Sequence, residues 1–210
     1  MTVERSLEYL RSLLREMIKL PKETEWVEFK QNNADPQAIG KYISALANSA
    51  ALLGKQSSYL VWGVDNATHT VTGTNFTPSN TRHKQQELES WLLQKITPKI
   101  HFRFFEFATP EAVDAVILEV QAASHTPVQF DGTEYIRVGS YKKKLREFPE
   151  KERALWRVFD QVPFEQQMAA KNVSTDEVLK LLDYPAYFEL TDMPLPMVAM
   201  PFYRLWRPTS

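Results

Sequence analysis

Two short segments combine carboxylates with apolar residues. Glu23 precedes Glu28 by five residues, and Lys30 follows Glu28 at the spacing that places two side chains on one face of a strand. Asp65 ends a second apolar segment. Two or three carboxylates with an open water position suit Mg²⁺ or Mn²⁺, and such an ion can activate water against a phosphodiester. These spacings make Glu23, Glu28 and Asp65 candidate catalytic residues and metal ligands, with Lys30 offsetting phosphate charge.

The same residues have a structural interpretation. Val27 and Phe29 alternate with Glu28 and Lys30, so the apolar pair is predicted to face the core. Glu23 has the wrong parity for the strand face of Glu28 and can join it only from the preceding turn. A Glu-x-Lys pair on a solvated strand is more often a surface salt bridge than a catalytic pair. Both interpretations stay open at this stage.

A basic run near residue 140 indicates a second kind of chemistry. Its cations could follow a phosphate backbone while a tyrosine stacks on an exposed base. The alternative is a solvated hairpin edge, on which lysines discourage pairing with other sheets. The candidate nucleic-acid-binding residues are Arg137, Tyr141, Lys142, Lys143, Lys144 and Arg146.

Composition bounds the class of protein. The chain has 210 residues, of which 43% are hydrophobic and 24% charged, so it can bury a real core. The net charge of −1 gives no global field for a polyanion, and any nucleic-acid site must be a local patch. Without cysteine, disulfides and thiolate metal sites are excluded. No apolar run reaches the roughly 20 residues of a membrane span, so we expect a cytoplasmic protein with no membrane partner.

The hydrophobic periods predict an α+β fold, with helices packed on a mixed, mostly antiparallel sheet. Asp35-Pro36 is a helix start signal, and Asp131-Gly132 is the strongest hairpin signal. We expect helices over about 2–19, 36–50, 83–96 and 149–161, and strands over about 26–31, 59–64, 100–108, 112–120, 127–130 and 134–138.

The elements suggest three parts. An N-terminal helix over 1–20 precedes the main domain over 21–160, and a helical, proline-rich appendage over 161–210 is a possible start of a further domain. Ser174 and Glu177 form a capping box inside this appendage. The tail is either an extended arm or the cut end of a longer chain, and the sequence does not decide between the two.

Four motifs in this order resemble the Alba-like domain shared by Schlafen proteins and many bacterial regulators. They are Glu23 with Glu28-Phe-Lys30, Ile43-Ser-Ala-Leu-Ala-Asn-Ser49, Leu60-Val-Trp-Gly-Val-Asp65 and Tyr135-Ile-Arg-Val-Gly-Ser140. The resemblance covers roughly residues 20–146. It implies an Alba-like fold and, in the Schlafen branch, a three-carboxylate endoribonuclease site directed at structured RNA such as tRNA.

The resemblance places two acidic positions on Glu23 and Glu28. At the third, the family has an Asp-Asp pair where this chain has Asp65-Asn66, so a neutral amide replaces one carboxylate. The loop over 50–58 is also longer than the short Gly-Gly turn that is common in the family.

These observations support three functional hypotheses. The preferred one is the nucleic-acid-binding domain of a bacterial transcriptional regulator, with DNA or RNA as partner. The second is a Mg²⁺- or Mn²⁺-dependent endoribonuclease, and the third is an oligomerisation or adaptor module. No other cofactor is expected. The glycine pattern of a phosphate-binding loop for ATP is missing, since Gly54-Lys55 continues with Gln56. The sequence does not decide whether the chain forms a homo-oligomer.

Overall fold

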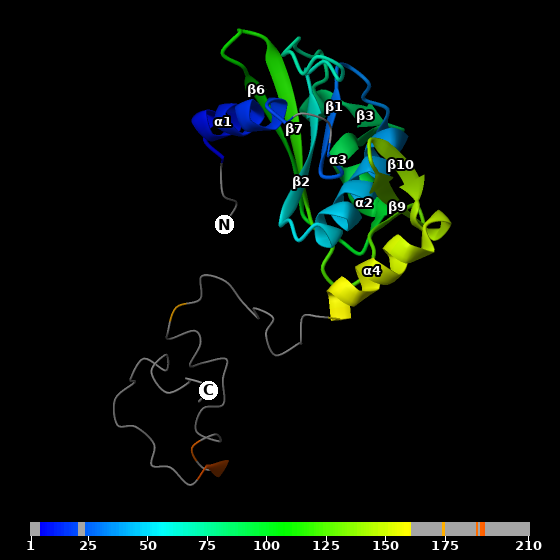
Figure 1. Cartoon of the computed structure of the whole chain (residues 1–210). Helices are drawn as coiled ribbons and strands as arrows, with labels where there is room; N and C mark the ends of the chain where they lie inside the picture. Colours follow the sequence, from blue (N-terminus) through cyan, green and yellow to red (C-terminus); the bar gives the residue numbers. More distant parts are fainter. Residues whose placement is uncertain (1–4, 21–23, 161–173, 175–187, 189, 192–210) are drawn as a thin grey trace. The chain divides into compact units, whose positions relative to one another are not determined.

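The computed structural model describes residues 5–20, 24–160, 174, 188 and 190–191 (Figure 1). Contacts divide the chain into two units, Met1–Val162 and Pro163–Ser210. The predicted appendage over 161–210 and its capping box lie almost entirely outside the described residues.

The predicted α+β fold is confirmed, with three sheets in the described residues where one was expected. Two of them have four strands: the larger sheet, with the longer strands, has the order β1-β2-β7-β6, and the smaller sheet has the order β10-β9-β8-β5. The strands β3 and β4 form a separate two-stranded sheet. Among the strands that the structure describes, β1 and β2 pair in parallel and the other pairs are antiparallel. The strands are β1 (Val27–Lys30), β2 (Ser57–Trp62), β3 (Arg82–His83), β4 (Gln86–Glu87), β5 (Ile96–Thr97), β6 (Phe102–Ala108), β7 (Asp114–Gln121), β8 (Gln129–Phe130), β9 (Thr133–Val138) and β10 (Tyr141–Lys144).

The helices follow from local signals that the sequence carries. Ser6 caps α1, and Asp35 caps α2 by accepting a hydrogen bond from the backbone N–H of Ala38. Pro36 occupies the first helical position of α2, as predicted. The helices are α1 (Leu7–Ile18), α2 (Pro36–Leu52), α3 (Leu88–Lys95) and α4 (Pro149–Asp160), with 3₁₀ turns η1 (Pro78–Asn80) and η2 (Leu145–Glu147).

The larger sheet is covered on both faces where its interior strand β2 is apolar, from Tyr59 to Trp62. Tyr59 and Val61 of β2 pack in a cluster with the buried face of α1, and Val27 and Phe29 join them. Leu60 and Trp62 face the opposite side, where α2 packs. The prediction of a central strand covered on both faces is therefore confirmed for Tyr59 to Trp62, whereas Gly63 and Val64 lie beyond the end of the strand.

The helix α2 lies between the two sheets (Figure 1), which explains why nearly every side of it is buried. Its polar residues bond to the backbone of the smaller sheet. Asn48 donates to the carbonyl oxygens of Val128 and Tyr135, both at 2.9 Å, and accepts from the N–H of Val128 at 2.7 Å. Ser49 accepts from the N–H of Arg137 at 3.0 Å. These bonds fix where β9 lies over β1.

Two turns of the domain depend on left-handed backbone angles. The predicted helix over 83–96 begins only at Leu88, because Lys84 and Gln85 adopt left-handed φ angles of 48° and 66° and form a turn between β3 and β4. Asp131 and Gly132, with φ angles of 50° and 74°, form the predicted turn between β8 and β9. No helix within the described residues has the length and apolar character needed to cross a bilayer.

Candidate nucleic-acid interface

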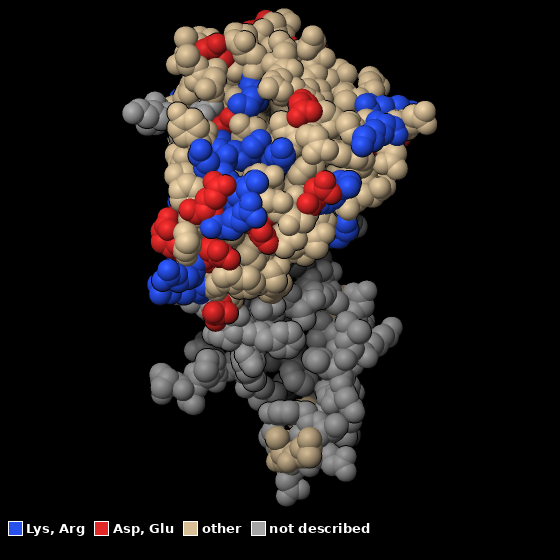
Figure 2. Space-filling model, turned by 90° about the vertical axis from the view of Figure 1, so that its right-hand side faces the viewer, with Lys and Arg blue, Asp and Glu red and all other residues tan. Residues whose placement is uncertain are grey.

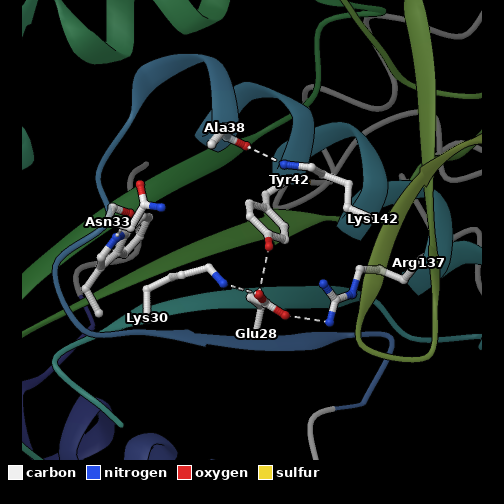
Figure 3. A network of polar contacts seen from close by, with 8 residues as sticks. Glu28, Lys30, Asn33, Ala38, Tyr42, Arg137 and Lys142 are labelled. Atoms are coloured by element: carbon white, nitrogen blue, oxygen red, sulfur yellow. Dashed lines mark hydrogen bonds and ion pairs between the residues drawn. The ribbon is translucent and has the colours of Figure 1, made fainter. Parts of the chain in front are cut away.

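Glu28 is the centre of a buried polar network (Figure 3). It lies on β1 between Val27 and Phe29, which pack on the α1 side, so its carboxylate points toward α2. Oε1 accepts from the ammonium group of Lys30 and, at 2.8 Å, from the hydroxyl of Tyr42. Oε2 is 2.5 Å from Nη2 of Arg137. Both carboxylate oxygens are therefore engaged by groups from three different elements.

The environment of Glu28 favours its charged form. Burial alone raises the pKa of this carboxyl, but Arg137, Lys30 and the Tyr42 hydroxyl together outweigh burial and hold the pKa below its usual value. The same carboxylate raises the pKa of Lys30, against the effect of that lysine's own burial. Burial and the neighbouring Glu28 both raise the pKa of Tyr42. At neutral pH, Glu28 and Lys30 are therefore charged, whereas the Tyr42 hydroxyl keeps its proton.

Arg137 is placed differently from the expectation that it contacts a phosphate backbone. Its side chain is 0% exposed and pairs with Glu28, whose side chain is 3% exposed. In β9 the neighbouring Ile136 is also fully buried, so both faces of the strand are covered at this point. The guanidinium therefore lies in the interior, where it positions Glu28.

The strand β10 distributes the basic run between two faces. Lys142 is opposite Arg137 in the β9–β10 register, so these two side chains share the face that meets α2. Tyr141 and Lys143 point the other way and are exposed, with the lysine ammonium 5.8 Å from the centre of the tyrosine ring. Arg146 is exposed just beyond the strand, and Lys144 is half-buried. The outer face of β10 thus presents Tyr141 and Lys143 to solvent, and Arg146 is exposed in the 3₁₀ turn η2 that follows.

The face shown in Figure 2 carries lysine and arginine side chains among aspartate and glutamate side chains. It therefore lacks a field of one sign. A polyanion binding there would meet local cations, in keeping with the net charge of −1.

Asp65 takes part in a loop rather than in the Glu28 network. Its Oδ1 accepts from the N–H groups of Ala67 and Thr68 at 3.0 and 2.8 Å, and its Oδ2 accepts from Gln31 at 2.7 Å. The Thr68 backbone N–H is the main reason that the pKa of Asp65 lies below its usual value. Asp65 lines an open groove of about 430 Å³ to which Glu28 does not belong.

The predicted metal site fits these positions poorly. Glu23 lies outside the described residues, so the structure does not place it. Among the residues that the structure does place, no three of His, Cys, Asp and Glu gather as metal ligands would. Because both oxygens of Glu28 are engaged and Asp65 caps its own loop, the described side chains fit an ion-pair network and not a divalent-cation site.

Tyr42 and Asn33 are parts of this region that the sequence pattern did not indicate. Tyr42 lies beside the apolar stripe of α2 and carries no periodic signal, yet its ring lies within 6 Å of the charged groups of Lys142, Arg137 and Lys30. The backbone carbonyl oxygen of Asn33 accepts a hydrogen bond from the indole N–H of Trp62 at 2.9 Å, which holds Asn33 in place.

The fold and these side chains define an α+β domain with a buried Glu28–Arg137 pair below a strand that carries exposed cations. Residues 23–146, more than half of the chain, match the family described as Schlafen, AlbA_2. The chain belongs to this family. Family membership supports a domain related to nucleic acids.

Thirteen chains of solved structure match this chain. The DIP2311 protein from Corynebacterium diphtheriae shares 15% sequence identity, with a TM-score of 0.43, over 70% of this chain and 29% of that protein. This chain thus spans less than a third of that protein's length. The N-terminal domain of a Nitrosomonas europaea protein named as related to the ATP-dependent DNA helicase RecG shares 19% identity, with a TM-score of 0.40, over 67% of this chain and 93% of that domain. No curated protein matches.

Proposed function

We propose that this chain contributes the nucleic-acid-binding domain of a cytoplasmic transcriptional regulator, and that the outer face of β10 contacts the phosphate backbone of DNA or RNA. The observation that carries the proposal is the exposed combination of Tyr141, Lys143 and Arg146 within a Schlafen, AlbA_2 domain. Tyr141 is 69% exposed, which suits a ring that stacks on an unpaired base.

The buried network supports this function indirectly. Arg137 and Glu28 join β9 to β1, and the asparagine and serine side chains of α2 hold β9 in place. The strand β10 therefore rests on a fixed support, although it is an edge strand of its sheet. Binding through a few phosphate contacts is expected to be weakly sequence-specific and strongly salt-dependent.

The contacts of Glu28 favour binding over cleavage. A catalytic carboxylate that holds Mg²⁺ or Mn²⁺ needs an oxygen that is free to bind the ion. Both oxygens of Glu28 are in contact with other groups, which belong to Lys30, Tyr42 and Arg137. The endoribonuclease hypothesis depends on Glu23, whose position the structure does not describe. We therefore place binding first.

Fluorescence anisotropy with labelled single- and double-stranded DNA and RNA tests the proposal. The double variant Lys143→Glu, Arg146→Glu should abolish binding at low salt. The matched control Arg82→Glu, Lys84→Glu reverses two exposed charges at the separate β3–β4 hairpin and should bind as the wild type does. Equal affinities of the two double variants would refute the proposed surface.

A further inference from the structure

Lys142 occupies an unusual position for a lysine on an edge strand. Its Nζ lies 3.9 Å from the centre of the Tyr42 ring and 3.4 Å from the carbonyl oxygen of Ala38, at the beginning of α2. No carboxylate of the described residues forms an ion pair with it. Burial is the main cause that lowers the pKa of Lys142 to about 8, and the nearby Lys41, Lys30 and Arg137 lower it further, while Glu28 opposes them.

Lys142 and Lys30 line one cavity of about 180 Å³, located between the larger sheet and the first turns of α2. Its floor is apolar and is formed by Leu60 and Trp62, while Asn33 and Tyr42 add polar groups. In the part of the chain that the structure describes, no carboxylate belongs to this lining. Lys30 brings its ammonium group while it is paired with Glu28, and Lys142 brings one that has no carboxylate partner among the described residues, so the cavity carries excess positive charge that attracts an anion.

The first turns of α2 strengthen this attraction. The cavity is bounded by Ala38, Ile39 and Tyr42, which belong to the N-terminal part of the helix, where the helix dipole is positive. Figure 3 shows Lys142 reaching back over Tyr42 toward Ala38, while the Lys30 ammonium group, from β1, is bonded to Glu28. The positive groups thus come from three separate elements.

The size of the cavity selects the ligand. Sites for whole small molecules occupy roughly 300–1,000 Å³, and 180 Å³ is below that range but ample for a phosphate group. Lys30 and Asn33 also line the neighbouring open groove of about 430 Å³. The carboxamides of Gln31, Asn32 and Asn66 line that groove as well, and carboxamides can both donate to and accept from sugar hydroxyls and base edges.

We propose that the cavity between β1 and α2 binds a phosphate monoester through Lys30 and Lys142, with the attached nucleoside in the carboxamide-lined groove. The monoester comes from the terminal phosphate of a nucleic-acid strand or from a free mononucleotide. This site goes beyond the proposed function, because binding along the outer face of β10 requires only internal phosphodiesters.

Anisotropy with one oligonucleotide sequence carrying a 5′-phosphate, a 3′-phosphate or hydroxyl ends tests the strand-end source. We expect one phosphorylated end to bind about tenfold more tightly than the hydroxyl-ended strand. Lys142→Met keeps the apolar stem and should reduce this ratio to about one. Lys144→Met, on the same face of β10 but outside the cavity lining, should preserve the ratio. A ratio that survives Lys142→Met overturns the site.

A second measurement needs no substitution. Acylation of the full chain, mapped by mass spectrometry, should be slowed at Lys142 but not at Lys144 when AMP or inorganic phosphate is added. Protection by AMP without any end preference identifies a free mononucleotide as the ligand. If neither protection nor an end preference is seen, the site is overturned. Binding of hydroxyl-ended strands tests the proposed function separately. If these strands do not bind, protection of Lys142 by AMP still tests the phosphate site.

Discussion

The pair formed by Arg137 and Glu28 makes a prediction that can be worked out in detail. Arg137→Met removes the cation next to Oε2 of a carboxylate whose side chain is 3% exposed. Breaking a buried ion pair on one side costs about 3–5 kcal/mol. We expect about 3 kcal/mol, because Lys30 and Tyr42 keep their contacts to Oε1. For a unit of this size, that loss lowers Tm by about 6–12 °C.

Urea unfolding of four variants measures this effect: Arg137→Met, Glu28→Gln, the double variant that combines them, and Arg146→Met as a control. Arg137→Met should lose about 3 kcal/mol, whereas Arg146→Met, an exposed arginine nearby in the chain, should change the free energy of unfolding by less than about 0.5 kcal/mol. Adding Glu28→Gln to Arg137→Met removes the orphaned charge and should recover part of the loss. A coupling energy between the two sites of less than about 0.5 kcal/mol would refute the assignment of Arg137 as the structural partner of Glu28.

The same pair determines the behaviour in acid. The pKa of Glu28 is lower in the folded than in the unfolded chain, so its contribution to stability is complete above the unfolded pKa. That contribution disappears as pH falls through the folded pKa. The stability difference between the wild type and Glu28→Gln should therefore begin to shrink as pH falls below about 4.3, the usual glutamate pKa, and disappear only below the lower pKa of the folded chain.

Three further predictions follow from other described contacts. Lys142 has a pKa of about 8 in the folded chain and a higher pKa in the unfolded chain. The free energy of unfolding of the wild type should therefore rise between pH 8 and about 10.4, and that of Lys142→Met should not. Urea unfolding at each pH measures this difference. Asn48→Ala leaves buried backbone groups of Val128 and Tyr135 without partners and should cost about 2–4 kcal/mol in the same assay, whereas the exposed Asn66→Ala should cost less than about 0.5. Structured RNA such as tRNA should remain whole after incubation with Mn²⁺, and cleavage that disappears in Glu28→Gln would restore the endoribonuclease hypothesis.

Local signals were sufficient for most of the fold. Alternation placed Val27 and Phe29 in the core, and Asp35-Pro36 marked the beginning of α2. Asp131-Gly132 marked its turn because both residues tolerate left-handed φ angles. Each of these features depends on residues that are close in sequence, where steric and capping preferences act directly.

The candidate site was less predictable because it depends on contacts distant in sequence. Alternation showed that Arg137 and Ile136 face opposite sides of β9, but not that both sides are covered. Glu28 and Arg137 are brought together only when α2 separates the two sheets and its polar residues hold β9. Lys142 is followed by Lys143 and Lys144, so nothing in the sequence distinguished it from them or indicated its half-buried position beside Tyr42.

Chemical-shift mapping of the full chain with an oligonucleotide tests the binding surface most directly. Backbone amides of Tyr141–Lys144 and Arg146 should shift in a saturable manner that weakens from 50 to 200 mM salt, while those of the β3–β4 hairpin stay in place. Saturable shifts confined to residues away from β10, or none at low salt, would contradict the account.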